Sequence, residues 1–550
     1  MTSSAAILDG YVDEPACLGV PPYLSPYIRT CAGVLLEREY DLRYLTIDML
    51  RRDPGLLRTL DRAALVLVIA GLTVPGKYLG GTPATLSEVE QVGARLRGPV
   101  KVLGGPILYG SSAGGGRKAT RREIAGYDVF LPGSPAEALD DYLAGREPRG
   151  KGDYGRSNRW TVAGAPVIRE HPSYPRVMCE LETGTGCHRS IAGGCSFCTE
   201  PFHGPPRFRD PAAVAAEAGA LYREGARHFR LGRQADLLTY GVAGGKEFPR
   251  PDPGVLERLF SGIRAAAPDL STLHIDNMNP GTIARHEEAS EEALRVIVAH
   301  HTPGDVAAFG METADPEVVV RNNLKAVPAE VMRAVEVVNR AGAIRRDGIP
   351  ELLPGLNFVS GLAGETAGTF ARNQEFLSEV LARGLQVRRV NLRQLMPFPG
   401  TRAYADNTLG KHDREFRRFK EWVRKEFDLP MLARVFPAGT VIRSVEVELP
   451  GPTSFGRPMG SYPILVGIPL ELPVRMVLDA VVVDWGMRSV TALPVPVDVN
   501  HLPVPALRWF PGVGKKRAAA IAAARPFRSP EEFRRVAGPT PLEGLLSFLP

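Results

Sequence analysis

The sequence predicts a multidomain α/β protein, and two observations lead to this fold class. Over the first 145 residues, short apolar runs alternate with amphipathic stretches, and a second, longer alternation of the same kind begins near Arg176. Apolar runs of about four to eight residues indicate buried strands, whereas an apolar period of about 3.6 residues indicates a helix. Because strands that alternate with helices pair in parallel, each region is expected to fold around its own parallel sheet.

The first alternation predicts a Rossmann-like domain over residues 1–145. Its expected helices are SPYIRTCAGVLLER, TLSEVEQVGARLR and SPAEALDDYLAG, and its expected strands are 42–47, 64–72, 100–105 and 127–133. The stretch GREPRGKGDYGRSNRW that follows has no apolar period. Residues 146–172 are therefore predicted to be a linker.

The second alternation predicts six β/α units over residues 173–430. Its first strand, VMCELETG, leads directly into a loop with three cysteines. Its last segment, HDREFRRFKEWVRKEF (412–427), alternates charges at a helical period and is expected to be a solvated linking helix. Residues 431–500 consist of short apolar runs separated by Gly/Pro turns, which predicts a small β-barrel.

Composition and charge limit the setting in which the protein works. The 550 residues are 44% hydrophobic, yet no apolar run approaches the roughly 18 to 20 residues of a membrane span, so we expect a cytoplasmic protein with no membrane partner. The formal net charge is +6, and residues 501–550 hold eight Lys/Arg against three Asp/Glu. Because the excess charge is concentrated at the C-terminus, this segment is expected to face a polyanion.

Three of the six cysteines, Cys187, Cys195 and Cys198, lie within twelve residues. Disulfides use cysteines in pairs, and a closed structural zinc site takes four ligands. Three thiolates leave one coordination position of a metal centre open for a substrate. Gly193 and Gly194, directly before the second cysteine, would let the loop approach such a centre closely. A zinc site completed by His188 or Cys179 is the alternative.

Several motifs resemble those of radical S-adenosylmethionine (SAM) enzymes. Cys195-Ser-Phe-Cys198 is similar to the family's Cys-x-aromatic-Cys pair after the first barrel strand. The later phrases resemble the tRNA methylthiotransferase branch in the same order, namely LGRQADLLTYG (231–241), FGMETADPEVVVRNN (309–323), LNFVSGLAGET (356–366) and MPFPGTRAY (396–404). One departure is that seven residues separate Cys187 from Cys195, where the family usually has three. The chain is most similar to an archaeal-type group with a C-terminal helix-hairpin-helix.

This resemblance implies a partial (β/α)6 barrel with its active site at the carboxyl ends of the strands. It further implies that Cys187, Cys195 and Cys198 hold a 4Fe-4S cluster, that SAM binds the fourth iron, and that one electron from a donor protein gives a 5′-deoxyadenosyl radical. The residues expected to bind SAM by analogy are Gly232, Arg233, Gln234, Glu312, Thr313, Ser360 and Gly361. Among the side chains at another strand end, His274, Asp276, Asn277 and Asn279, we expect one to contact substrate. For each of these residues a turn, cap or solvated charge is the alternative role.

The first domain resembles the cobalamin-binding domain that precedes many such barrels. The first histidine of the chain is His171, so cobalamin would bind without a protein nitrogen ligand, or the domain has lost it and serves as a scaffold. The methylthiotransferases instead carry three N-terminal cysteines for a second cluster. Here the region has only Cys17 and Cys31, and a second cluster would need Cys179 as well.

The C-terminal regions contain two further resemblances. The dipeptide Gly456-Arg457 resembles the TRAM RNA-binding domain, and a purely structural β domain fits equally well. The final helix, PGVG turn and helix resemble a helix-hairpin-helix that binds nucleic-acid phosphates, through Gly512, Gly514, Lys515, Lys516 and Arg517. Cations at a helix N-terminus oppose its dipole, so stability alone would not select them. A hairpin used only for packing is the alternative.

Three functions are consistent with these observations. The first is a radical SAM enzyme that modifies RNA, in particular tRNA, with the C-terminus binding RNA rather than DNA. The second is a radical SAM enzyme that acts on a protein or small molecule, with or without cobalamin. The third is an iron-sulfur protein that binds nucleic acid without catalysis.

Overall fold

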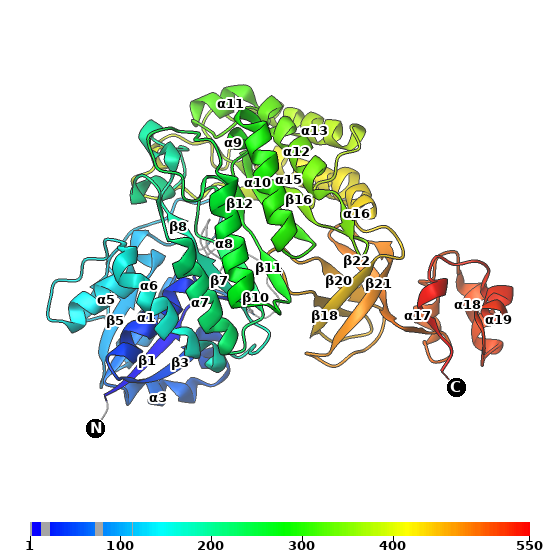
Figure 1. The fold of residues 1–550 in the computed structure, drawn as a ribbon, viewed down its shortest axis with the longest axis horizontal. Helices are drawn as coiled ribbons and strands as arrows, with labels where there is room; N and C mark the ends of the chain where they lie inside the picture. Colours follow the sequence, from blue (N-terminus) through cyan, green and yellow to red (C-terminus); the bar gives the residue numbers. More distant parts are fainter. Residues whose placement is uncertain (1–2, 13–22, 72–80, 113, 550) are drawn as a thin grey trace.

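The computed structural model describes residues 3–12, 23–71, 81–112 and 114–549. Four regions follow one another along the chain, and Figure 1 shows them as an N-terminal sheet domain, a barrel with its helices outside, a small β-barrel and a projecting C-terminal tail. Within the described residues, no helix is both long and apolar enough to cross a lipid bilayer.

The N-terminal domain is a five-stranded sheet in the order β3-β1-β4-β5-β6, with every pair parallel. The order reverses between β1 and β4, and such a switch point is where doubly wound sheets bind ligands. The central strand β1, with the short apolar run AAIL, was not among the predicted strands. The elements are β1 (Ser4–Asp9), α1 (Pro26–Glu37), β3 (Asp41–Thr46), α2 (Ile47–Arg52), α3 (Leu57–Asp61), β4 (Leu65–Ile69), α4 (Leu86–Arg95), β5 (Val100–Gly104), β6 (Val129–Leu131) and α5 (Pro135–Leu143).

The segment 146–172 is packed structure rather than the predicted linker. It contains α6 (Tyr154–Ala163), which lies against α1, and Trp160 on it is only 1% exposed. A Cβ on Gly33 would come within 2.0 Å of the Trp160 carbonyl oxygen, so this close contact requires glycine. The apolar periodicity of the sequence did not predict α6, because Trp160 is its only large buried side chain and most of its other residues are polar or charged.

The barrel is the largest of the four regions. Its elements are β7 (Met178–Glu182), β8 (Gly184–Thr185), β9 (Arg207–Phe208), α7 (Pro211–Arg223), β10 (His228–Gly232), α8 (Pro253–Ala266), β11 (Thr272–His274), β12 (Asn277–Met278), α9 (Pro280–Arg285), α10 (Glu287–His300), β13 (Asp305–Glu312), α11 (Pro316–Arg321), α12 (Pro328–Gly342), β14 (Arg345–Arg346), β15 (Ile349–Pro350), β16 (Leu352–Ser360), α13 (Ala367–Ala382), β17 (Arg389–Gln394) and α14 (Arg402–Ala405).

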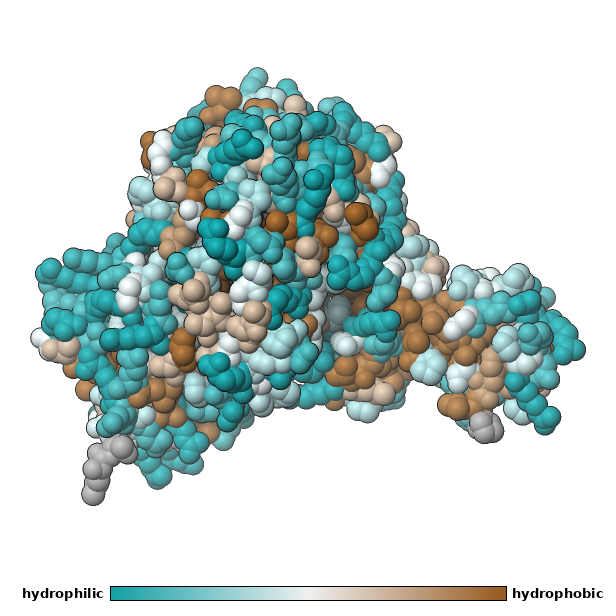
Figure 2. Space-filling model, viewed as in Figure 1, coloured by the Kyte–Doolittle hydropathy of each residue, from teal (hydrophilic) through white to brown (hydrophobic). Residues whose placement is uncertain are grey.

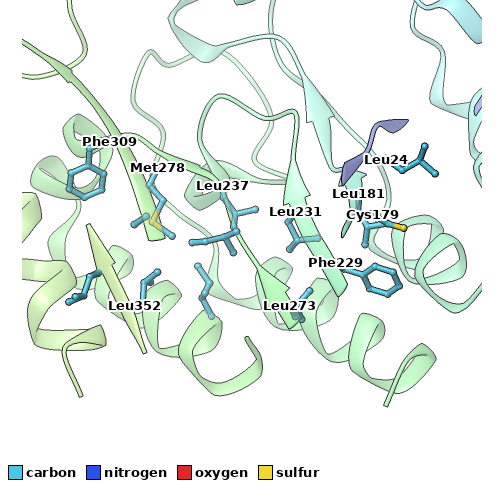
Figure 3. Close-up of a cluster of buried hydrophobic side chains, with 14 of the residues drawn as sticks. Leu24, Cys179, Leu181, Phe229, Leu231, Leu237, Leu273, Met278, Phe309 and Leu352 are labelled. Atoms are coloured by element: carbon cyan, nitrogen blue, oxygen red, sulfur yellow. The ribbon is translucent and has the colours of Figure 1, made fainter. Parts of the chain in front are cut away.

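The barrel strands form two parallel sheets rather than a closed ring. One has the order β11-β10-β7-β2, where β2 (Tyr23–Leu24) comes from the N-terminal part of the chain, and the other has the order β12-β13-β16-β17. The sheets adjoin at β11 and β12, which follow one another closely in the chain, so the outer edges of the barrel are β2 and β17. The buried side chains between strands and outer helices form a continuous apolar core, in which Figure 3 shows Cys179 beside Leu24 and Leu181.

The helical segment after the barrel is buried on one side, contrary to the solvated helix predicted for 412–427. It consists of α15 (Asp413–Trp422), a π-helical turn (Val423–Asp428) and α16 (Leu429–Val435). Phe416, Phe419, Val423 and Phe427 form its buried stripe. Their spacing of three to four residues was hidden among seven Lys/Arg residues in the same segment.

Residues 441–495 form a closed five-stranded barrel in the order β18-β19-β20-β22-β21, which we call the β domain. Its strands are β18 (Val441–Leu449), β19 (Ser454–Arg457), β20 (Leu465–Ile468), β21 (Val477–Trp485) and β22 (Ser489–Val495). The tail then adds β23 (Val497–Asp498), α17 (Val504–Leu507), α18 (Lys515–Ala523), α19 (Pro530–Ala537) and β24 (Leu546–Ser547).

The tail and the β domain share one apolar core. Val481 and Leu493 of the β domain cluster with Leu507, Ile521 and Phe533 of the tail. In Figure 2, hydrophobic surface gathers on the β domain and at its junction with the tail, while the outer end of the tail is hydrophilic. The tail is therefore attached by packing, and its polar end is turned to solvent.

Candidate metal and cofactor site

The three cysteines of the loop, Cys187, Cys195 and Cys198, line one large cavity of about 1380 Å³. The barrel contributes to the same cavity Asn277, Gly310, Glu312, Asn357 and Val359. Because these residues lie on or directly after parallel strands, the cavity occupies the interior and the carboxyl end of the barrel, where catalytic residues of such folds gather.

Left-handed glycines shape the cysteine loop. Cys187 precedes a short 3-10 turn (His188–Ala192), and Gly193 and Gly194 follow with φ of 77° and 61°. A Cβ on Gly194 would lie 2.4 Å from Pro201. The two glycines thus allow the tight return of the chain that brings Cys195 and Cys198 back beside Cys187.

A second segment holds the loop in place. The Asn323 side-chain amide donates to the carbonyls of Ala192 and Gly194 at 2.9 and 2.8 Å. Beside it, the Ser196 amide N–H donates to the Asn322 carbonyl at 2.9 Å, and the Ser196 hydroxyl donates to Asn322 Oδ1 at 2.7 Å. The asparagines of the motif 309–323 therefore position the cysteine loop.

The thiols lie in an apolar setting beside two cations. Burial raises the pKa of the Cys187 thiol to about 11 and also raises the pKa values of Cys195 and Cys198. Arg189, which is 3% exposed, donates from Nη1 to Cys195 Sγ at 3.1 Å. Burial alone would lower the pKa of Lys325, but the nearby cysteines and Glu312 raise it overall. Arg189 and Lys325 can therefore offset the negative charge that the sulfur atoms carry as thiolates.

This donor set fits an iron-sulfur cluster held by three thiolates. Three sulfur ligands share one cavity wall, and two cations offset their charge. Neither proposed fourth zinc ligand lines this cavity, because Cys179 is buried in the core and the His188 ring packs against Phe208. Within the described part of the chain, no three Cys, His, Asp or Glu side chains gather around a point suited to a single metal ion.

Among the residues predicted to bind SAM, Glu312 lines the cavity. It is 7% exposed, it has a left-handed φ of 67°, and burial raises its pKa to about 7 against the opposing charges of Lys325 and Arg393. A non-glycine residue in this conformation stores strain that often marks functional sites. Neighbouring Thr313 instead accepts the amide N–H of Asp315, which is the N-cap residue of α11.

The other predicted SAM residues lie behind the cavity wall. The Gly232 carbonyl accepts from the Thr183 amide N–H at 3.2 Å, the Arg233 guanidinium lies 3.5 Å from Glu182, and Gln234 Oε1 accepts from the Thr183 hydroxyl. From this turn, Ala235 is the residue that lines the cavity.

At the later strand, Ser360 and Gly361 are both bonded to the same carboxylate. Glu365 accepts the Ser360 hydroxyl at 3.0 Å and the Gly361 amide N–H at 3.1 Å. The preceding residue on β16, Val359, lines the cavity in their place.

The polar residues at the strand end 274–279 make different kinds of contact. Asn277 lines the cavity, and Asn279 caps α9 by accepting the Gly281 amide N–H. His274 Nδ1 accepts the Ser461 amide N–H at 3.0 Å. Asp276 pairs with buried Arg230. Asn277 is therefore the member of this group placed to contact a substrate.

A segment of the β domain closes the side of the barrel. In residues 458–464, which we call the closing segment, the carbonyls of Gly460 and Ser461 accept the Tyr23 hydroxyl from edge strand β2. The Tyr462 carbonyl accepts from Arg388, beside the opposite edge strand β17. The Tyr462 hydroxyl donates to Asp276 Oδ1 at 2.7 Å inside the barrel. The closing segment thus spans the gap between the two barrel edges.

The N-terminal domain supplies another wall of the same cavity. Tyr11 follows β1 at the switch point of the sheet, and Asp48, Arg52, Pro106 and Tyr109 join it in lining the cavity. Beyond Tyr109, the amide N–H groups of Gly116 and Ala119 donate to carbonyls of the segment after β17. The switch point and the cysteine loop therefore face one shared space.

The remaining cysteines are separate from this space. Cys31 on α1 and Cys179 on β7 are fully buried in the apolar core, where burial raises both thiol pKa values, that of Cys179 to about 11. Cys17 lies outside the described residues. His171 is also buried, and its Nδ1 accepts the Ser173 amide N–H.

The tail presents its predicted phosphate-binding residues to solvent. Gly514 is the N-cap of α18, and a Cβ on Gly512 or Gly514 would meet nothing within 4 Å. Lys515 and Lys516 are exposed, and Arg517 donates to the Gly512 carbonyl at 2.9 Å. In the β domain, by contrast, Arg457 of the dipeptide Gly456-Arg457 lines the barrel cavity.

Comparison with known proteins identifies relatives over the whole chain. No family model matches. An uncharacterised protein of Archaeoglobus fulgidus is 43% identical over 538 residues, 97% of each chain, and one of Methanocaldococcus jannaschii is 42% identical over 89% of this chain and 93% of that one. The solved structure of the radical SAM methyltransferase TsrM from Kitasatospora setae, with tryptophan substrate and a SAM analogue bound, matches with a TM-score of 0.51 and 16% identity over 73% of this chain and 75% of that one. Over this part of the chain, the fold is similar to that of the methyltransferase.

Proposed function

The chain belongs to the same family as these two relatives from Archaeoglobus fulgidus and Methanocaldococcus jannaschii, and we propose that it is a radical SAM enzyme. One observation carries the proposal: three loop cysteines share a single cavity with Glu312, Lys325 and Asn277 in a fold of this class. When bound, a 4Fe-4S cluster with SAM at its fourth iron supplies a 5′-deoxyadenosyl radical that abstracts a hydrogen atom from the substrate.

The chain's own residues would hold and orient the reactants. The thiolates of Cys187, Cys195 and Cys198 are the iron ligands, and Arg189 fixes Cys195 through its N–H to sulfur bond. Glu312 and Lys325, with opposite charges, are suited to the ammonium and carboxylate groups of SAM. The closing segment and the N-terminal domain wall the cavity and would limit the access of water to it.

Cobalamin is a second cofactor that this cavity could take, at the switch point of the N-terminal sheet. From that domain, the described lining residues Tyr11, Asp48, Arg52, Pro106 and Tyr109 include no histidine. We therefore propose that any cobalamin binds without an imidazole ligand from this domain, and that absorbance spectra of protein incubated with hydroxocobalamin would test its binding.

For the substrate, we propose RNA, with tRNA as the first candidate. The support is the tail, where exposed Lys515 and Lys516 stand beside the open amides of Gly512 and Gly514. A protein or small-molecule substrate is the second candidate, since the cavity is walled on several sides.

The direct test is product analysis of anaerobically reconstituted, dithionite-reduced protein. We expect 5′-deoxyadenosine and methionine to form from SAM, slowly without substrate and faster with it. Mass spectrometry of nucleosides from cells with and without the protein would then identify a modified RNA. Retention of the cluster without any SAM cleavage, even with added RNA, would instead support a non-catalytic iron-sulfur protein that binds nucleic acid.

A further inference from the structure

Two asparagines on one parallel sheet line the barrel cavity with small residues between them. Asn277 on β12 lies opposite Ala308 of β13, and Asn357 on β16 lies opposite Gly310, two residues farther along β13. Both asparagines and Gly310 line the cavity. Alternate residues of a strand share a face and neighbouring strands lie about 4.8 Å apart, so the Cα atoms of the two asparagines are about 12 Å apart on the same face of the sheet.

The neighbours of Asn357 determine which end of its amide is open to the cavity. The Arg389 guanidinium, which can only donate, donates to Asn391 Oδ1. Asn391 Nδ2 must therefore be the donor to Asn357 Oδ1, at 2.8 Å. Asn357 Nδ2 is left with no acceptor in the described part of the chain, so it can donate to a ligand in the cavity.

The amide of Asn277 is fixed in the opposite sense. Its Nδ2 donates to Asp276 Oδ2 at 3.1 Å and to the Gln234 carbonyl at 3.4 Å, and a carboxylate or a carbonyl can only accept. Among the residues that the structure describes, none donates to Asn277 Oδ1. The sheet therefore offers a ligand one donor, from Asn357, and one acceptor, from Asn277.

Tyr462 of the closing segment connects the two amides. Its hydroxyl donates to Asp276, which is the partner of Asn277. The Arg389 guanidinium carbon lies 4.5 Å from the centre of the Tyr462 ring, and Arg389 begins the chain of bonds that leads to Asn357. Because both chains of contacts start from one side chain, the two amides face the same part of the cavity.

This part of the cavity adjoins the groups that we propose for SAM. A Cβ on Gly310 would lie 2.5 Å from Glu312 Oε1 and 2.8 Å from Lys325 Nζ. Both charged groups therefore lie over Gly310, which is the strand neighbour of Asn357. A ligand bound by the two amides would thus lie beside the proposed SAM site.

We propose that Asn277 and Asn357 bind a nucleobase of the substrate. A nucleobase is a neutral planar ring that carries hydrogen-bond donors and acceptors on its edge, and enzymes that act on a base read these groups after taking the base out of the stack. One ring can bridge the two amides, because each hydrogen bond spans about 2.9 Å. The proposal deepens the proposed function, on which it rests for RNA as the substrate. A peptide amide also carries a donor and an acceptor, and the experiment distinguishes the two ligands.

Equilibrium dialysis of the full chain, without cluster or SAM, tests the proposal. The probes are adenosine, cytidine, guanosine, uridine, ribose and N-acetylglycine N-methylamide, and we expect at least one nucleoside to bind and the last two probes not to bind. Asn357→Asp keeps the size of the side chain and the bond from Asn391 but replaces the open donor with an acceptor, and Asn277→Ala removes the open acceptor. Each change should weaken nucleoside binding by about tenfold or more. Gln91→Glu, an amide-to-acid change on the exposed face of α4, is the matched control and should leave binding unchanged.

The arms of the experiment separate the possible outcomes. The two variants act at opposite ends of the site, so either one decides the question if the other does not fold. Nucleoside binding by the wild type that is lost in a folded variant supports the proposal. Binding of the peptide amide alone would overturn it and identify a protein substrate, and equal nucleoside binding by wild type and variants, or none by the wild type, would also overturn it. SAM cleavage in that case would leave a radical SAM enzyme intact, whereas nucleoside binding without SAM cleavage would contradict the proposed reaction and leave this site intact.

Discussion

At the scale of single residues, the three loop cysteines and the groups around them determine what the site can hold. Replacing Cys187, Cys195 or Cys198 with alanine is expected to abolish a stable 4Fe-4S cluster, because two protein thiolates cannot hold it securely. Iron and sulfide analysis after anaerobic reconstitution measures this effect. Cys31→Ala is the matched control and should keep its iron, since Cys31 is buried in the core of the N-terminal domain. Normal iron content in any one of the three variants would refute the ligand assignment.

A second residue-scale prediction concerns Asp9, at the end of β1. Burial raises the pKa of its carboxyl to about 7, against hydrogen bonds from Tyr44 and Tyr11. Because the folded pKa lies above the unfolded value of about 3.9, the stabilising contribution is complete at low pH and is lost as the pH rises toward 7. The midpoint of thermal unfolding should therefore fall over this range in the wild type, and Asp9→Asn should remove that part of the slope.

Asp61→Asn is the control, because the pKa of the Asp61 carboxyl is lowered in the folded protein whereas that of Asp9 is raised. Backbone N–H groups of Arg97 and Gly98 lower the pKa of the exposed Asp61 carboxyl, so its contribution is present above about pH 4 and is lost in acid. Calorimetric midpoints of the cluster-free protein at pH 3, 4, 6 and 8 compare the two variants, because the effect of Asp61 lies below about pH 4 and that of Asp9 above it. A wild-type pH slope that persists unchanged in Asp9→Asn would contradict the assignment.

Site residues that lie close together in sequence could be predicted, whereas residues that reach the site from distant parts of the chain could not. The spacing of Cys187, Cys195 and Cys198 was sufficient to select them, and the structure brings them to one cavity. Lys325 and Tyr462 reach the same cavity from distant elements, and no local pattern marks either residue. Arg189 lies beside Cys187 in sequence, but its contact with Cys195 depends on the fold of the loop.

At the scale of elements, the tail has exposed lysines that are separate from its buried apolar core, so substitutions can change its charge without changing its packing. Replacing Lys515 and Lys516 with alanine should weaken RNA binding for all sequences and flatten the plot of log affinity against log salt by up to about two units, if each lysine neutralises one phosphate. Filter binding over a salt series measures both quantities. Lys411→Ala with Lys425→Ala, two exposed lysines of the barrel region, is the control. Undiminished affinity with the same slope would make the tail a packing module.

Point substitutions test the tail better than its removal does. The tail shares an apolar core with Val481 and Leu493, and β24 pairs with β23. Deleting residues 501–550 would therefore expose part of the β domain and confuse loss of binding with loss of structure.

The closing segment allows a further test at this scale. Tyr462→Phe removes the hydroxyl that donates to Asp276, so we expect a loss of about 1 kcal/mol in stability and faster amide exchange across residues 458–464. Hydrogen-exchange mass spectrometry of the full chain measures the local effect. Tyr404→Phe, on α14, is the control. Unchanged exchange in Tyr462→Phe would show that the other bonds of the segment suffice.

Elements with strong periodicity were predicted well, and amphipathic elements masked by charge were not. The strands of the N-terminal sheet at 42–47, 64–72 and 100–105 are present as β3, β4 and β5. α6 and α15 failed because their buried faces consist of a few aromatic anchors among arginines, such as Trp160 and Phe419, and tertiary packing supplies their stability. The closure of the barrel gap by a later domain has no signature in sequence at all.

At the scale of the whole molecule, a buried ionic group joins the N-terminal domain to the barrel. Glu217 on α7 lies between Arg29 on α1 and Arg209, and all three side chains are at most 2% exposed. Glu217→Gln leaves two buried guanidinium groups short of charge, so we expect a loss of about 3 to 5 kcal/mol. Thermal unfolding and limited proteolysis should show earlier release of the N-terminal domain.

An exposed pair provides the comparison for this variant. Glu147→Gln removes the partner of Arg149, and because these side chains are 71% and 65% exposed, the change should cost no more than about 1 kcal/mol. Equal effects of the two substitutions would mean that the buried group does not hold the domains together.

The closing segment also bears on how the protein matures during synthesis. A ribosome delivers the chain from its N-terminus, so the cysteine loop emerges long before residues 458–464, which span the gap between β2 and β17. Until the β domain has folded, this side of the cavity that the thiols line has no cover. We therefore expect iron and sulfide to be loaded most readily onto nascent or partly folded chains. Folding of the β domain then closes the side of the loaded barrel.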